Sequence, residues 1–389
     1  MTRKRPPPVR VAPGRGRRPV DRRLRAIVLL LVGFGLVMVY SASSVLSMVQ
    51  HGTSTVYFAS QAAKAAIGIL AMFIVAALDY RIWARVAKPL VWFTAACLLF
   101  LALGVGGSLT PEINGARRWI ALPGFVFQPI ELAKLALVVW MAATIAKKGK
   151  KLDRASEGLV PLLVLPALLS ALVLLQPDFK GAFMIGLLAV ALLWLGGVRW
   201  GYLLRIGAAT VPLGAVAMVL EPYRMRRLAA FFDRGEDVQG VSYQINQSLI
   251  SLGSGGWFGV GLGSSRQKFA FLPMAHTDFI VSIIGEELGI VGSLALLAAF
   301  LYLGVLGYRI ARRAPDAFGF LLGSGLTTLI LASALLNIGV ATAALPTTGL
   351  PLPFISFGGT ALIVYLVCAG ILLSISRDQV DEPRRREAA

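Results

Sequence analysis

The chain has 389 residues, of which 57% are hydrophobic and only 15% are charged, and its mean hydropathy is +0.75. About 25% of the residues of an ordinary soluble protein are charged, so this composition argues against a soluble protein. A net charge of +19 would suggest nucleic-acid binding in a soluble chain, but here the charges lie between long apolar blocks. We therefore expect a membrane protein with no nucleic-acid partner.

The first 25 residues hold ten Lys or Arg and five Pro. Such a composition cannot build a hydrophobic core, and it predicts a disordered basic cytoplasmic tail over residues 1–25. The apolar block that follows, 26–46, contains Ser41-Ala42-Ser43, which resembles a signal-peptide cleavage site. The block is longer than a signal sequence and further apolar blocks follow it, so a retained first span is favoured.

Ten apolar blocks follow one another along the chain, and each can be interpreted as a membrane-spanning helix of about 20 residues. Lipid cannot satisfy free backbone groups, so the spans must be helical. We predict an all-α polytopic membrane domain over 26–376, with a large extracytoplasmic loop at 221–278 between spans seven and eight, and a C-terminal tail at 377–389. The blocks are 26–46, 59–78, 89–105, 129–146, 158–175, 180–197, 203–220, 279–307, 318–340 and 357–376.

Lys and Arg are distributed unevenly between the two sides of these blocks. Of the 38 Lys and Arg residues, 27 lie in the two terminal tails and in the loops on the same side. Positive residues concentrate in cytoplasmic loops, so both termini are predicted to be cytoplasmic, in agreement with an even number of spans. In the large outer loop, the amphipathic run Tyr243–Leu252 predicts a short helix at the membrane interface.

Ionisable residues at membrane depth are costly, which makes the few that occur functional candidates. Asp278 lies just before the block 279–307, where its carboxylate could act as a general base at the water–lipid boundary. The alternative is that Thr277 or Asp278 caps the N-terminus of the next helix. His276 lies two residues earlier, and we interpret it as a polar neighbour of Asp278 in preference to a second base.

Four further acidic residues and one lysine are candidates. Glu131 and Lys134 are three residues apart and share a helix face, which fits either a structural ion pair or a role in positioning a site. Asp178 lies in a predicted turn, where it could cap the next helix or help to hold a cation on a diphosphate. One of Glu286 and Glu287 is expected to face the bundle interior and to pair with a base.

Basic residues also gather on the predicted outer side, against the general charge trend. Their side chains suit either the phosphate oxygens of a diphosphate or anionic lipid head groups. The chain has no Walker loop, no H-E-x-x-H and no Cys/His cluster, so we expect neither a nucleotide nor an organic cofactor. The outer basic residues are Arg117, Arg118, Arg224, Arg226, Arg227, Arg266 and Lys268.

Four blocks together resemble the SEDS family (RodA, FtsW and SpoVE), the peptidoglycan glycosyltransferases of shape, elongation, division and sporulation. The resemblance covers nearly the whole chain after the basic tail, and its segments 261–268 and 275–289 are more similar to the division subgroup FtsW than to RodA. The chain departs from the family pattern at Met274, where Glu is common, at Lys180, which interrupts a usual Leu-Gly-Thr run, and at Ile130. The four blocks are 114–120 with 128–134, 176–178, 243–289 and 345–359.

This resemblance implies that the chain polymerises lipid II into β-1,4 glycan strands at the outer face of the bacterial cytoplasmic membrane. It implies that Asp278 deprotonates the acceptor hydroxyl in a single inverting displacement that releases undecaprenyl diphosphate. The leaving diphosphate would be stabilised by Arg side chains and by a divalent cation, Mg or Mn, for which Asp178 and Asp278 are the candidate ligands. The implied partners are lipid II, the lipid-linked glycan strand, membrane lipids and a class B penicillin-binding transpeptidase.

Two other functions fit part of the sequence. Charges at the membrane midplane, broken helices and inverted repeats would indicate a lipid II flippase. No internal repeat is evident, however, and the candidate charges lie toward one face. A scaffold that recruits the transpeptidase would leave the outer carboxylates and arginines unexplained. The glycosyltransferase is therefore the favoured interpretation.

Overall fold

The computed structural model describes residues 19–112, 115–149, 152, 158–219, 225, 231, 241–269, 271–347 and 349–379. Each of the ten expected apolar blocks coincides with one helix. In chain order these are α1 (Arg22–His51), α2 (Val56–Ala77), α3 (Ile82–Leu103), α4 (Pro129–Lys148), α5 (Val160–Leu174), α6 (Phe179–Leu195), α7 (Trp200–Val219), α10 (Ile280–Arg312), α11 (Ala317–Ala341) and α12 (Gly359–Arg377).

The start of α1 differs from the sequence prediction. The helix begins at Arg22 because the Asp21 carboxylate accepts hydrogen bonds from the backbone N–H groups of Arg23 and Leu24, both at 2.9 Å. The last basic residues of the expected tail are therefore helical. The remainder of that tail, residues 1–18, lies outside the described residues.

Seven helices of the described chain are long and apolar enough to cross a membrane: α1, α2, α3, α4, α10, α11 and α12. The apolar helices α5 and α6 are shorter, with 15 and 17 residues. At 1.5 Å per residue they reach only about 22–26 Å, which is less than a hydrocarbon core of about 30 Å. The chain is thus a multi-pass membrane protein, and the count of ten spans stays a prediction.

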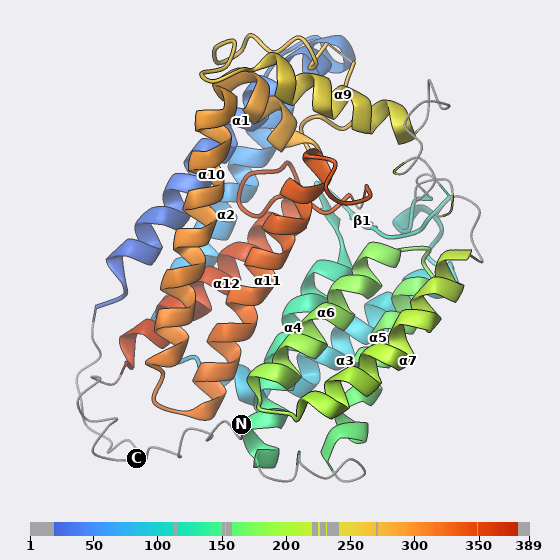
Figure 1. The fold of residues 1–389 in the computed structure, drawn as a ribbon, viewed down its shortest axis with the longest axis vertical. Helices are drawn as coiled ribbons and strands as arrows, with labels where there is room; N and C mark the ends of the chain where they lie inside the picture. Colours follow the sequence, from blue (N-terminus) through green and yellow to red (C-terminus); the bar gives the residue numbers. More distant parts are fainter. Residues whose placement is uncertain are drawn as a thin grey trace.

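The helices form two neighbouring groups (Figure 1). One contains α1, α2 and α10 to α12, in which α12 packs on α2 and α10 on α11. The other contains α3 to α7, in which α3 packs on α4 and α5 on α6. The backbone N–H of Asp21 donates to Ser376 Oγ at 3.0 Å, so the start of α1 and the end of α12 lie together, at the lower end of Figure 1.

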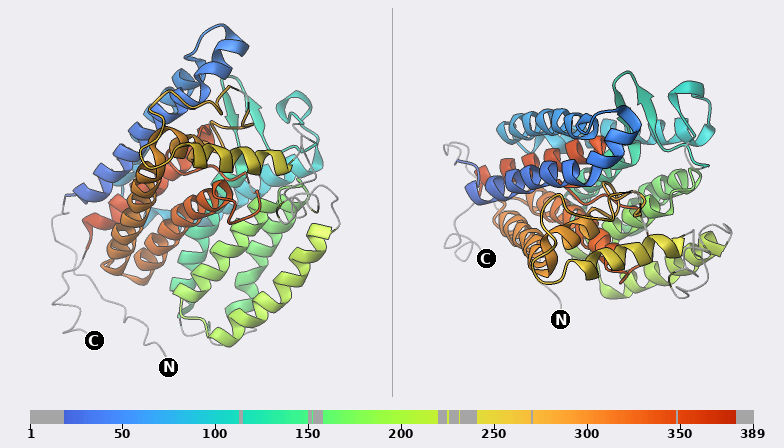
Figure 2. Two further views of the ribbon diagram at one scale, coloured as in Figure 1. Left: turned by 45° about the horizontal axis from the view of Figure 1, so that its top comes forward. Right: turned by 90° about the horizontal axis from the view of Figure 1, so that it is seen from above.

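The opposite end of the bundle carries the irregular structure. A short helix, α9 (Val241–Ser254), lies across it (Figures 1 and 2) and confirms the helix predicted in the outer loop. A 3₁₀ turn at Gly107–Leu109 precedes a hairpin of two antiparallel strands, β1 (Ile120–Leu122) and β2 (Phe125–Phe127), with Ala121 opposite Val126. The predicted all-α class of the membrane domain is confirmed, and this hairpin of three residues per strand is a local departure from it.

Helix α10 is interrupted near the end of the bundle that carries α9. Gly289 has φ 69° and ψ −166°, a conformation that only glycine adopts readily. The carbonyls of Glu286 and Glu287 instead accept hydrogen bonds from the N–H groups of Val260 and Gly261, at 2.9 and 3.1 Å. The segment after α9 is therefore bonded to the break in α10.

This backbone contact explains the glycine-rich run after α9. A Cβ on Gly255 would overlap the carbonyl of Gly285, and a Cβ on Gly259 would overlap the carbonyl of Glu287. Gly255 and Gly259 thus permit two backbones to approach each other.

Candidate functional site

The segment 276–278 is held by the turn that precedes α12. Ser356 Oγ donates to the Thr277 carbonyl at 2.6 Å, and the Phe357 N–H donates to the His276 carbonyl at 3.0 Å. The same hydroxyl accepts from the N–H of Leu352 at 2.9 Å. Residues almost 80 positions apart in the sequence are therefore fixed to each other at the end of the bundle that carries α9.

A third contact fixes Asp278 itself. Asn337 of α11 donates its amide to the Asp278 carbonyl at 2.9 Å and to the Leu350 carbonyl at 2.6 Å. The N-cap of α10 is Phe279 and makes no side-chain capping bond, and the Thr277 hydroxyl donates to the Met274 carbonyl at 3.1 Å. The capping alternative for Thr277 and Asp278 was therefore wrong, and the Asp278 backbone is held while its carboxylate is partly exposed.

A lysine lies beside this carboxylate. Lys180, the second residue of α6, donates through Nζ to the carbonyl of Gly349. A Cβ on Gly349 would lie 3.0 Å from Asp278 Oδ2 and 3.2 Å from Lys180 Nζ. Lys180, whose sequence signal is only a departure from the family pattern, therefore lies in the candidate site.

Asp178 has a structural role in the described chain. Its carboxylate is buried and accepts from the Gly181 N–H at 3.2 Å, which caps α6 and confirms the capping alternative. Arg118 donates to the carbonyls of Gln176 and Pro177, at 3.3 and 2.5 Å. Arg118 thus holds the turn that places Asp178 and, through α6, Lys180.

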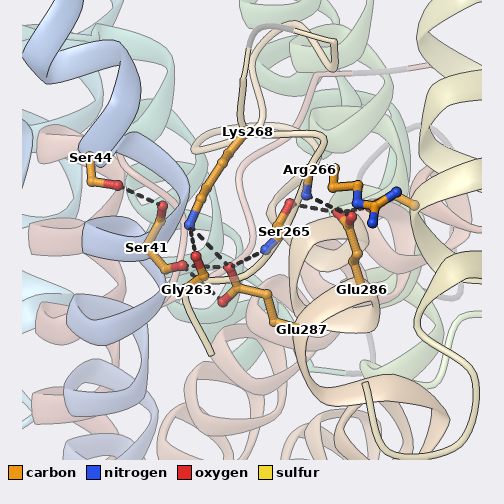
Figure 3. Close-up of polar contacts among 9 residues, drawn as sticks. Ser41, Ser44, Gly263, Ser265, Arg266, Lys268, Glu286 and Glu287 are labelled. Carbon is orange, nitrogen blue, oxygen red and sulfur yellow. Dashed lines mark hydrogen bonds and ion pairs between the residues drawn. The ribbon is translucent and has the colours of Figure 1, made fainter. Parts of the chain in front are cut away.

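Two buried glutamates hold the loop before Asp278 (Figure 3). Glu286 accepts from the Ser265 hydroxyl at 2.5 Å, from the Ser251 hydroxyl at 3.1 Å and from the Arg266 N–H at 2.9 Å. The Arg266 side chain is exposed. Glu286 therefore connects α9, the loop and α10.

Glu287 makes the second set of contacts. It accepts from the Ser41 hydroxyl of α1 at 2.6 and 2.8 Å, and from the Ser265 N–H at 3.3 Å. Lys268 lies 3.8 Å away and also donates to the Gly263 carbonyl. Both glutamates are buried, and Glu287 makes the pairing with a base that was predicted for one of them.

Glu131 and Lys134 form an ion pair inside the bundle. Lys134 Nζ lies 2.8 Å from Glu131 Oε1, and the two side chains are 1% and 4% exposed. Glu131 is in the first turn of α4, where the helix dipole stabilises a negative charge. The contact confirms that the two residues pair, and both alternatives for their role remain open.

His276 packs among aromatic rings. Its ring centroid lies 5.2 Å from that of Tyr57 and 5.6 Å from that of Phe357. Burial lowers the pKa of His276 to about 4, so the ring is neutral at pH 7. His276 therefore supports the turn through packing and its carbonyl.

The outer arginines do not converge on one point. Arg117 donates to the Gly104 carbonyl at 2.5 Å and pairs with Glu112 at 3.4 Å. Together with the carbonyl contacts of Arg118, this indicates that both residues hold the loops at the end of the bundle that carries α9. Three further arginines, Arg224, Arg226 and Arg227, lie outside the described residues.

The described residues do not fit a divalent cation held by the protein. No three His, Cys, Asp or Glu side chains converge in this part of the chain. The Asp178 carboxylate is buried as a helix cap, and the Asp278 carboxylate has Lys180 beside it. A second positive charge at Asp278 would be repelled by this lysine.

The fold and the site define a multi-pass helical membrane protein with a backbone-clamped aspartate at one end of its bundle. The profile of the cell cycle protein family, FtsW/RodA/SpoVE, matches residues 21–381. The chain belongs to this family, and the resemblance predicted from the sequence is confirmed.

Individual relatives cover almost the whole chain. A probable peptidoglycan glycosyltransferase FtsW from Geobacter metallireducens is 42% identical over 364 residues, covering 92% of this chain and 95% of the relative. Stage V sporulation protein E from Bacillus subtilis is 37% identical over 359 residues, covering 92% and 97%.

Solved structures of similar proteins agree with the family assignment. RodA from Thermus thermophilus aligns with a TM-score of 0.69 at 28% identity, covering 93% of this chain and 98% of RodA. A chain of a peptidoglycan synthase complex aligns with a TM-score of 0.76 at 29% identity, covering 93% and 99%.

Proposed function

We propose that this chain is a peptidoglycan glycosyltransferase that polymerises lipid II into β-1,4 glycan strands, with Asp278 as the general base. The observation that carries the proposal is the clamp on Asp278. Three residues from two segments, α11 and the turn before α12, fix the backbone of residues 276–278, whereas the Asp278 carboxylate caps no helix. A fixed backbone with an available carboxylate is what proton abstraction from a bound hydroxyl requires.

The proposed reaction is a single displacement. The Asp278 carboxylate takes the proton of the acceptor hydroxyl as its oxygen bonds to the anomeric carbon of the donor. The bond from that carbon to the diphosphate oxygen breaks, and undecaprenyl diphosphate leaves with the electron pair. The configuration at the anomeric carbon inverts, so no covalent enzyme intermediate is needed. No step requires a metal ion held by the protein.

The names of the relatives support this function, since several are probable peptidoglycan glycosyltransferases. We place the end with α9 and Asp278 outside the bacterial cytoplasmic membrane and both termini in the cytoplasm, on the distribution of Lys and Arg. The similarity to a chain of a peptidoglycan synthase complex supports a partner enzyme, which we propose is a class B penicillin-binding transpeptidase.

The test is polymerisation of fluorescent lipid II by the full chain in liposomes, with and without a cognate transpeptidase. Long glycan products that need the wild-type chain, and that are absent with the transpeptidase alone, are expected. A chain that makes no polymer in either condition, but moves lipid II between leaflets, would replace the enzyme with a flippase.

A further inference from the structure

Lys180 lies where its positive charge does not stabilise its own helix. It is the second residue of α6, and cations near a helix N-terminus oppose the helix dipole. Its side chain extends away from α6, and the ammonium group donates a hydrogen bond to the Gly349 carbonyl in the segment before α12. A residue that is unfavourable for its own helix and extends to another segment needs a different explanation.

The explanation follows from what surrounds Gly349. Asp278 Oδ2 and Lys180 Nζ both lie against this glycine, at 3.0 and 3.2 Å from the position of a Cβ. Gly349 has φ +70°, so its conformation and its neighbours both disfavour a side chain. The glycine thus lets the carboxylate and the ammonium approach the same point.

Three other described basic residues near the site are bound elsewhere, and the Arg266 side chain is exposed. Arg117 contacts Glu112 and Gly104, and Arg118 holds the turn before α6. Lys268 is buried against Glu287. Of these basic residues, Lys180 is the one whose charged group lies against the same glycine as the Asp278 carboxylate.

We propose that Lys180 binds the diphosphate of the lipid donor and takes the place of a divalent cation beside Asp278. The proposal rests on the proposed function for its substrate, a lipid diphosphate. An ammonium has three donors, of which the Gly349 carbonyl takes one. The remaining donors can bind phosphate oxygens and stabilise the negative charge that develops on the leaving diphosphate.

Binding tests the role of Lys180 without turnover. All variants carry Asp278→Asn, and binding of undecaprenyl diphosphate to the full chain in detergent is measured by thermophoresis in EDTA. Hydrogen bonds to charged groups contribute about 1.5–3 kcal/mol, so Lys180→Gln should weaken binding by about 10- to 100-fold. Lys180→Arg should bind within about threefold of the parent, because it retains the charge.

Lys147→Gln is the matched control, because it removes the same charge from an exposed side chain in the last turn of α4, and it should leave binding unchanged. Melting temperatures identify a variant that fails to fold. If Lys180→Gln does not fold, the diphosphate affinity of Lys180→Arg is the measurement that tests the proposal. A Lys180→Gln variant that is folded and binds the diphosphate as tightly as its parent would overturn the proposal.

Turnover in the chain with intact Asp278 gives a second readout. We expect the wild type to polymerise lipid II in EDTA, and Lys180→Gln to require added Mg²⁺ with a raised KM. A wild type that needs Mg²⁺ as much as the variant does would contradict the role assigned to Lys180. If the wild type makes no polymer at all, the proposed function fails, and the binding result still decides whether Lys180 recognises a diphosphate.

Discussion

Single replacements of Glu131 or Lys134 should destabilise the protein much more than their joint replacement. At the observed separation of 2.8 Å, two unit charges attract each other by about 6 kcal/mol at an effective dielectric constant of about 20. Removing each ion from water costs several kcal/mol. The two terms roughly offset each other in the pair, whereas a lone ion retains only its desolvation cost.

We therefore expect Glu131→Ala and Lys134→Met each to lower the free energy of unfolding by about 3–5 kcal/mol. The double variant Glu131→Leu/Lys134→Met should lie within about 2 kcal/mol of the wild type, because it buries no charge. Thermal unfolding in detergent ranks these variants by stability. Lys147→Met, at an exposed position in the last turn of the same helix, serves as the control and should change stability by less than about 0.5 kcal/mol.

The double variant also separates the two roles left open for this pair. A stable double variant that polymerises lipid II shows that Glu131 and Lys134 form a structural pair. A stable but inactive one shows that they position the site. A double variant as unstable as either single variant would refute the electrostatic reasoning.

Three further predictions concern the end of the bundle that carries α9. Gly259→Ala should unfold at a markedly lower temperature than Gly253→Ala, because its Cβ overlaps the Glu287 carbonyl whereas Gly253 faces open space; equal melting temperatures would contradict this. Glu287→Ala should lower the free energy of unfolding by about 3–5 kcal/mol, since Lys268 loses its buried partner; adding Lys268→Met should restore part of the loss of melting temperature. His276 titrates below its ordinary 6.5, with a pKa of about 4, so the unfolded chain binds the proton first and stability falls as pH drops from 6.5 toward 4. His276→Phe should reduce the loss of stability between pH 7.5 and 5 by about 2 kcal/mol, and an unchanged pH dependence of melting would argue against a buried neutral ring.

The positions of the main helices follow from apolar composition, because lipid requires long apolar segments. Composition could not show that Asp21 caps α1 and brings Arg22 and Arg23 into the helix. It also could not show the break at Gly289, which depends on hydrogen bonds from the separate segment after α9. Local capping and long-range backbone pairing therefore account for the differences in the fold.

The candidate site was predictable only in part. Asp278 and the pair of Glu131 with Lys134 could be selected because charges are rare at membrane depth. Asn337 was missed, since an asparagine in an apolar helix gives no indication of which carbonyl it will meet 59 residues away. The arginines suggested phosphate binding, but Arg118 uses its guanidinium on the carbonyls of a turn.

The most direct test of the central claim is the rate of lipid II polymerisation by Asp278→Asn compared with the wild type. The substitution preserves the shape of the side chain and the backbone bond from Asn337, but it removes the base. We predict that Asp278→Asn folds, binds lipid II and polymerises at least about 100-fold more slowly, the range expected for loss of a general base. A folded Asp278→Asn variant that polymerises at the wild-type rate would contradict the account.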